Sequence, residues 1–139
     1  MHDLRDKVAV ITGASSGIGR ELAVCLAAKG CALALTDISP GSLKELADTL
    51  GRSRHLVTTH TLDVSKREDV YRTANIIHSA HGRVDMLINC AAVIVLETLE
   101  DITYDDFEWV MNVNFWGVVY IYYEGLSTVS QAEPSSPHC

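Results

Sequence analysis

Residues 8–19 read Val-Ala-Val-Ile-Thr-Gly-Ala-Ser-Ser-Gly-Ile-Gly. The apolar, largely β-branched run Val8–Thr12 predicts a strand that is buried on both faces. A glycine-rich turn follows, and Ile18, Leu22 and Leu26, one helical turn apart, predict a helix over about residues 18–29. This order of strand, glycine-rich turn and helix is typical of the first unit of a parallel α/β fold.

The alternation of strand and helix continues along the chain. Further strands are predicted at residues 32–36, within 55–62 and at 84–89. Helices are predicted to begin after Ser39, in a capping box at Ser65–Glu68, and after Thr103. The last helix would carry one apolar stripe, formed by Phe107, Val110, Met111, Asn114 and Val118. The sequence therefore predicts an α/β fold, a Rossmann-type doubly wound parallel sheet truncated to about four strands plus helices.

The composition excludes several classes of protein. The chain has 139 residues, with 11 basic and 18 acidic side chains and a net charge of −7. Such a chain lacks the basic face that nucleic-acid binding requires. No apolar run approaches the roughly 18 residues of a membrane span. The charged first residues are no secretory signal, so we expect a cytoplasmic protein. The four cysteines and the histidines show no zinc-ligand spacing, so no metal site is predicted.

The glycine-rich turn predicts a phosphate-binding site. The start of a helix offers free N–H groups and the positive end of its dipole, and glycines let a phosphate approach the backbone. The spacing, Gly-x-x-x-Gly-x-Gly, differs from the usual Gly-x-Gly-x-x-Gly. A turn can also contain glycine for conformational reasons alone. The preceding strand, the following helix and an acidic residue after the next strand favour phosphate binding.

That acidic residue is Asp37, which lies 18 residues after Gly19. A carboxylate there can accept hydrogen bonds from both hydroxyls of an adenosine ribose. It would repel a 2′-phosphate, and no Arg or Lys adjoins it. We therefore expect NAD rather than NADP as the cofactor. In the alternative interpretation, Asp37 only begins the turn before Ser39-Pro40.

Four segments in a fixed order complete the pattern. They are the glycine-rich turn, Asp63-Val64, Asn89-Cys90-Ala91-Ala92, and the stretch from Met111 to Gly117. Together they resemble the classical short-chain dehydrogenase/reductase family over about residues 5–120. The resemblance implies a nicotinamide dinucleotide as cofactor and hydride transfer with a small alcohol or carbonyl substrate.

The resemblance also implies a role for each matching residue. The pyrophosphate would be held by the turn, Asp37 would bind the adenosine ribose, and Asp63 and Val64 would flank the adenine. Asn89 and Ala91 would lie beside the nicotinamide ribose. Cys90 and Ala92 depart from the family's Asn-Asn-Ala-Gly, and Ala92 restricts a backbone position that glycine leaves free. The residues assigned to the turn are Gly13, Ser15, Ser16, Gly17, Ile18 and Gly19.

Asn114 matches the asparagine that the family uses in its proton relay. A structural asparagine, satisfied by neighbouring polar groups, is an equally good interpretation of this position. The family's tyrosine, with a lysine four residues later, has no counterpart here, because none of the five tyrosines is followed by lysine at that spacing. The tyrosine would be the general acid/base, so the isolated chain is predicted to be catalytically incompetent.

Residues 1–120 are thus expected to form the NAD-binding half-domain, and residues 121–139 a divergent, disordered tail. One hypothesis is an oxidoreductase by family. A second is a non-enzymatic truncated isoform or fragment that binds dinucleotide weakly or pairs with a full-length partner. Such pairing, or a homo-oligomer, would use the open edge strand at 84–89 or the helix at 104–122. A remoter third hypothesis is redox sensing by Cys90.

Overall fold

A computed structural model describes residues 3–51 and 54–130 as a four-stranded parallel sheet with helices on both faces. The strands lie in the order β3-β2-β1-β4. This confirms the predicted Rossmann-type α/β fold. In chain order the elements are β1 (Val8–Thr12), α1 (Gly17–Ala28), β2 (Ala32–Asp37), α2 (Pro40–Leu50), β3 (Val57–Thr61), α3 (Arg67–His81), β4 (Met86–Asn89), α4 (Tyr104–Met111), the π-helical turn η1 (Asn112–Trp116) and α5 (Gly117–Ser130).

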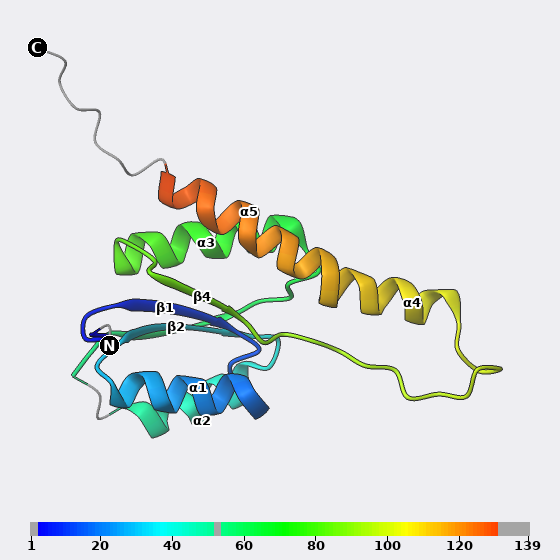
Figure 1. The fold of residues 1–139 in the computed structure, drawn as a ribbon, viewed down its shortest axis with the longest axis horizontal. Helices are drawn as coiled ribbons and strands as arrows, with labels where there is room; N and C mark the ends of the chain where they lie inside the picture. Colours follow the sequence, from blue (N-terminus) through cyan, green and yellow to red (C-terminus); the bar gives the residue numbers. More distant parts are fainter. Residues whose placement is uncertain (1–2, 52–53, 131–139) are drawn as a thin grey trace, which may run out of the picture.

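The sheet is the middle of three layers (Figure 1). Helices α1 and α2 cover one face, while α3 and α5 lie side by side over the other. Every residue of β1 is buried. Ile11 packs with Leu33, Leu35 and Leu46 toward α1 and α2, and Val10 packs with Ala34 and Ile77 toward α3. Burial on both faces explains why β1 is an unbroken apolar run.

The helix starts follow the predictions in part. A capping box does form at Thr103, where Asp106 N–H donates to Thr103 Oγ1 at 3.2 Å and Thr103 N–H donates to Asp106 Oδ2 at 2.9 Å. The box predicted at Ser65–Glu68 is wrong, because α3 begins at Arg67 after Lys66. The hydroxyl of Ser65 instead donates to Asp63 Oδ1 at 2.6 Å.

The stripe predicted for the last helix is also wrong. Phe107 and Met111 are 57% and 49% exposed, whereas Val113, Gly117 and Ile121 are the buried positions. The π turn at 112–116 changes the helical phase between the two halves. Gly117 then lies so close to the segment after β3 that a Cβ on it would be 2.7 Å from Val64 Cγ2. This contact selects the face that packs on the core.

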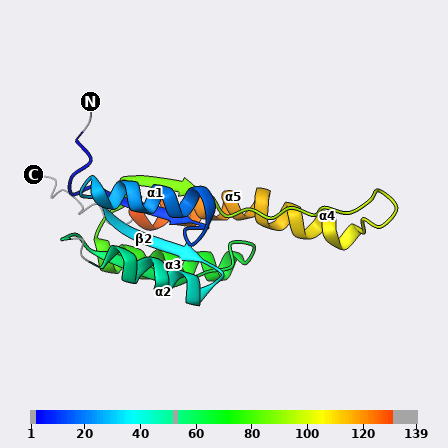
Figure 2. The ribbon, with the colours of Figure 1, turned by 90° about the horizontal axis from the view of Figure 1, so that it is seen from below.

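Helix α5 passes through the domain boundary expected at residue 120. It continues to Ser130, and Ile121 is buried with Leu62, Val64 and Val70. Residues 121–130 are therefore continuous with the rest of the fold. The remaining part of the expected tail, residues 131–139, lies outside the described residues. In Figure 2, α4 and the loop before it extend beyond the sheet as an arm.

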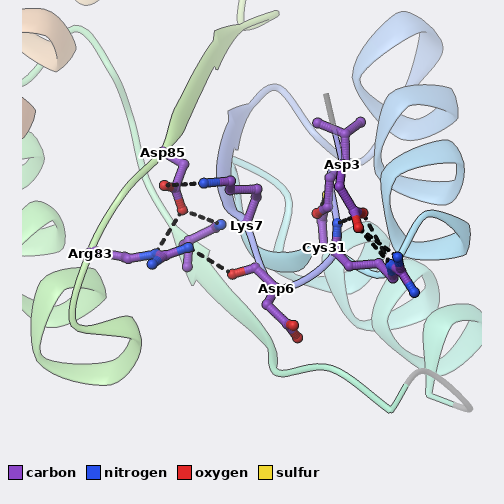
Figure 3. A network of polar contacts seen from close by, with 9 residues as sticks. Asp3, Asp6, Lys7, Cys31, Arg83 and Asp85 are labelled. Atoms are coloured by element: carbon purple, nitrogen blue, oxygen red, sulfur yellow. Dashed lines mark hydrogen bonds and ion pairs between the residues drawn. The ribbon is translucent and has the colours of Figure 1, made fainter. Parts of the chain in front are cut away.

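The amino-terminal ends of β1 and β4 are joined by a polar network centred on Asp85 (Figure 3). Its Oδ2 accepts hydrogen bonds from Val8 N–H and from Arg83 Nε, both at 2.9 Å. Lys7 Nζ lies 3.6 Å from Oδ1, and Arg83 also donates to the Asp6 carbonyl at 3.1 Å. The network fixes the start of β4 against β1. Within the described part of the chain, no helix has the length and apolar character needed to cross a bilayer.

Candidate functional site

A cleft of about 750 Å³ lies at the carboxyl ends of the strands, where parallel α/β sheets bind their ligands. The glycine-rich turn and the segments after β2, β3 and β4 form its walls, and the arm contributes one further side. The residues that line it are Gly13, Ser16, Gly17, Ile18, Gly19, Thr36, Asp37, Ile38, Leu62, Asp63, Val64, Asn89, Cys90, Ala91, Ala92, Val93, Trp109 and Val113.

The three glycines of the turn are required for different reasons. Gly13 has φ of +62°, and a Cβ there would lie 2.6 Å from the Ala91 nitrogen. A Cβ on Gly19 would lie 2.2 Å from the Gly13 carbonyl oxygen. These two glycines therefore allow the turn itself to pack. Gly17 has φ of +50° and open space where its Cβ would be, so it leaves the cleft accessible above the helix start.

The start of α1 presents backbone N–H groups to the cleft. The first hydrogen bond at the start of the helix runs from Arg20 N–H to the Ser16 carbonyl at 3.2 Å, and no side chain caps it. The N–H groups of Gly17, Ile18 and Gly19 precede that bond, so they have no acceptor within the helix. This arrangement can bind an anion.

Ser15 does not line the cleft, although the resemblance assigns it to the site. Its side chain is buried, and its N–H donates to Asp37 Oδ2 at 3.1 Å. The preceding amide, that of Ala14, donates to the Thr36 carbonyl at 3.0 Å. The first two amides after Gly13 therefore hold the turn against the end of β2.

Asp37 connects the two loops that border the cleft. Its Oδ2 accepts from Ser15 N–H, and its Oδ1 accepts from Ser39 N–H, also at 3.1 Å. Asp37 therefore begins the turn before Ser39-Pro40, and it also holds the glycine-rich turn through Ser15. Among the residues that the structure describes, no lysine or arginine lines the cleft beside the carboxylate of Asp37.

The far side of the cleft is organised by Thr12, for which no sequence pattern predicted a role. The Thr12 hydroxyl accepts hydrogen bonds from the N–H groups of Cys90 and Ala91, both at 3.2 Å. This fixes the segment after β4 beside Gly13. Ala92 fits without strain, because Asp6 is the one residue other than glycine with positive φ among those described. Asn89, Ala91, Asp63 and Val64 also line the cleft.

Asn114 lies outside the cleft. Its Oδ1 accepts from Val93 N–H and its Nδ2 donates to the Val93 carbonyl, both at 2.8 Å. The two bonds attach the loop after β4 to η1. Both polar groups of the amide are thus engaged by the backbone of Val93.

Six of the lining residues were not predicted from the sequence: Thr36, Ile38, Leu62, Val93, Trp109 and Val113. Ile38 is 68% exposed, and its position directly after Asp37 in the sequence is the signal that could have pointed to the cleft. Trp109 carried no such signal, because its place depends on how α4 packs.

Comparison with known proteins agrees with this geometry. The family model for short chain dehydrogenases matches residues 7–134. An uncharacterised oxidoreductase of Bacillus subtilis, YxnA, is 42% identical over 120 residues, and 11-beta-hydroxysteroid dehydrogenase A of Sesamum indicum is 41% identical over 127. Each match covers 86% of this chain but only 34% and 35% of the two relatives, so the chain spans about a third of their length.

Solved structures give the same result. A short-chain dehydrogenase/reductase from Burkholderia phymatum, in complex with NAD, superimposes with a TM-score of 0.84 at 33% identity. The match covers 96% of this chain and 48% of that structure. A mutant short-chain dehydrogenase/reductase from Serratia marcescens gives a TM-score of 0.85 at 27% identity, covering 92% of this chain and 53% of that one.

Proposed function

Since the chain belongs to the short-chain dehydrogenase family, we propose that its cleft binds a nicotinamide dinucleotide and prefers NAD to NADP. The N–H groups of Gly17, Ile18 and Gly19 bind the pyrophosphate. Asp37 accepts hydrogen bonds from the adenosine ribose. Asp63 and Val64 flank the adenine, and Asn89 and Ala91 lie beside the nicotinamide ribose.

The position of Asp37 is the observation that carries this proposal. The carboxylate lies on the cleft wall and also holds Ser15, next to the anion-binding start of α1. An adenosine ribose placed there could donate hydrogen bonds to the carboxylate, while the pyrophosphate attached to it accepts from the N–H groups at the start of α1. A 2′-phosphate would place negative charge against Asp37, and within residues 3–51 and 54–130 no lysine or arginine lines the cleft to compensate.

The reaction we propose for the family site is hydride transfer between the dinucleotide and a small alcohol or carbonyl compound. The dinucleotide supplies the hydride chemistry when bound. None of the five tyrosines of the chain has a lysine four residues later. A positioned general acid/base contributes roughly 10²–10⁴ in rate. We therefore propose that these 139 residues alone bind the cofactor without turning over. A cytoplasmic location stays a prediction.

Calorimetric titration with NAD and NADP tests the proposal. We expect the wild type to bind NAD at least about tenfold more tightly than NADP, since a charged hydrogen bond contributes about 1.5–3 kcal/mol. Asp37→Asn removes the charge while keeping an acceptor, so it should weaken NAD binding and reduce the preference. Asp48→Asn, which removes the same charge from the exposed surface of α2, is the control. Equal affinity of the wild type for both dinucleotides would contradict the preference for NAD.

A second candidate function is pairing with another protein chain. It is favoured by β4, which lies at the sheet edge with one side unpaired by another strand of the described sheet. Exposed aromatic side chains on α4 and η1, among them Phe107, Phe115 and Trp116, add apolar surface. Sedimentation velocity over a wide range of protein concentrations tests self-association. A rising mass is expected if β4 pairs between copies, and a constant monomer mass would exclude a homo-oligomer.

A further inference from the structure

Trp109 lies on the wall of the cleft, on an element that contributes nothing else to the predicted site. It belongs to α4, and Val113, four residues later in η1, lines the same cleft. Val113 is buried in one cluster with Leu62 and Val64, the residues on either side of Asp63. Trp109 therefore extends the wall outward from the segment at 62–64.

The side chain of Trp109 is 49% exposed although it borders a cleft. An indole ring with a free face is a good surface for a flat aromatic ligand, because stacking and burial both favour the contact. The neighbouring walls fit an apolar ring. Ile38, Leu62, Val64 and Val113 line the same cleft, and Asp63 is the acceptor among them for a ring amino group.

We infer that Trp109 stacks on the adenine ring of the bound dinucleotide and closes this side of the cleft. The inference rests on the proposed function, because the ring in question belongs to the cofactor. Through this stacking, α4, which forms part of the arm, would also take part in cofactor binding. It also makes Trp109 a reporter of binding, because an adenine stacked on an indole quenches its fluorescence.

The chain contains one suitable control, since it has two tryptophans. Trp116 lies on η1 and is 43% exposed, but it does not line the cleft. Its ring stacks on Tyr120 with a centroid distance of 6.0 Å and meets Phe115 edge-on at 5.2 Å. Trp116→Phe leaves Trp109 as the sole tryptophan, and Trp109→Phe leaves Trp116.

The test titrates both variants with ADP, which contains the adenine but no nicotinamide and so cannot accept energy from the indole. We expect ADP to quench the emission of Trp116→Phe and to leave that of Trp109→Phe unchanged. In calorimetry, Trp109→Ala should weaken ADP binding about tenfold, whereas Trp109→Phe and Trp116→Phe stay near wild type. Both tryptophans are about half exposed, and circular dichroism checks that each variant folds.

The outcomes separate the inference from the proposed function. ADP that binds in calorimetry without changing the emission of Trp109 overturns the inference and leaves the proposed function intact. Quenching by nicotinamide mononucleotide in place of ADP overturns the assignment to adenine. A Trp109 signal that changes only with protein concentration would assign the residue to contacts between chains and overturn the inference. No binding of ADP or NAD by the wild type would overturn the proposed function together with the inference.

Discussion

Thr12 is the residue whose side chain joins the two halves of the cleft. Its hydroxyl is buried and accepts from the N–H groups of Cys90 and Ala91. Thr12→Val keeps the shape but leaves the Ala91 N–H without this acceptor. We expect a loss of about 1–3 kcal/mol in the free energy of unfolding, measured with urea. Thr12→Ser retains the hydroxyl and is the matched control. Equal stability of the two variants would argue against this role.

Residues that line the cleft were predictable where their position directly after a strand follows a known sequence pattern. Gly17, Asp37 and Asp63 follow strands at the spacing of a nucleotide-binding unit, and they line the cleft. The sequence alone could not exclude Ser15 from the site, because the residue is held by a hydrogen bond from its N–H to Asp37, at the end of the next strand. Trp109 could not be found, because no local pattern indicates which side of α4 faces the cleft.

At the level of elements, the helical segment 104–130 also shows that a local pattern predicts a helix but not which of its sides is buried. The apolar spacing predicted a helix, and a helix forms, but Phe107 and Met111 are exposed. The π turn and the close approach of Gly117 to Val64 decide which positions are buried. Both are consequences of packing against the segment after β3, which the periodicity of one helix does not contain.

The start of β4 gives a prediction for pH dependence. Partial burial alone would raise the pKa of Asp85, but the Val8 N–H and the charges of Arg83 and Lys7 hold that pKa below its usual range. A carboxyl with a lowered folded-state pKa stabilises the fold above its unfolded pKa of about 3.9 and loses this effect as the pH falls through the folded value.

We therefore expect Asp85→Asn to unfold at a lower temperature than the wild type at pH 7. The difference should narrow as the pH falls from about 4 toward the lower folded-state pKa, because the unfolded carboxyl and then the folded one become protonated. Thermal unfolding at the two pH values measures both effects. Asp48→Asn, which breaks an exposed ion pair with Lys44, should change stability by less than about 1 kcal/mol. A difference between wild type and Asp85→Asn that stays constant down to pH 3 would contradict the assigned role of the carboxylate.

On the scale of the whole molecule, the parallel sheet was predictable from the alternation of apolar runs and helices, but the order β3-β2-β1-β4 was not, because doubly wound sheets occur with more than one strand order. Four strands of this kind have one common solution, a parallel sheet with helices on both faces. The cleft follows from it, because the carboxyl ends of β1, β2 and β4 then lie along one edge. In this order β4 lies at the edge of the described sheet, with one side unpaired by another of its strands.

The central claim is that the start of α1 and the end of β2 together bind the adenosine diphosphate part of NAD. Amide chemical shifts of the isotope-labelled chain, recorded by nuclear magnetic resonance during titration with NAD, test it residue by residue. We predict the largest shifts at Gly17, Ile18 and Gly19, with little change at Val8 and Asp85 on the opposite edge of the sheet. If those three amides did not move, or if the largest shifts occurred along α3 and β4 away from the cleft, the claim would be wrong.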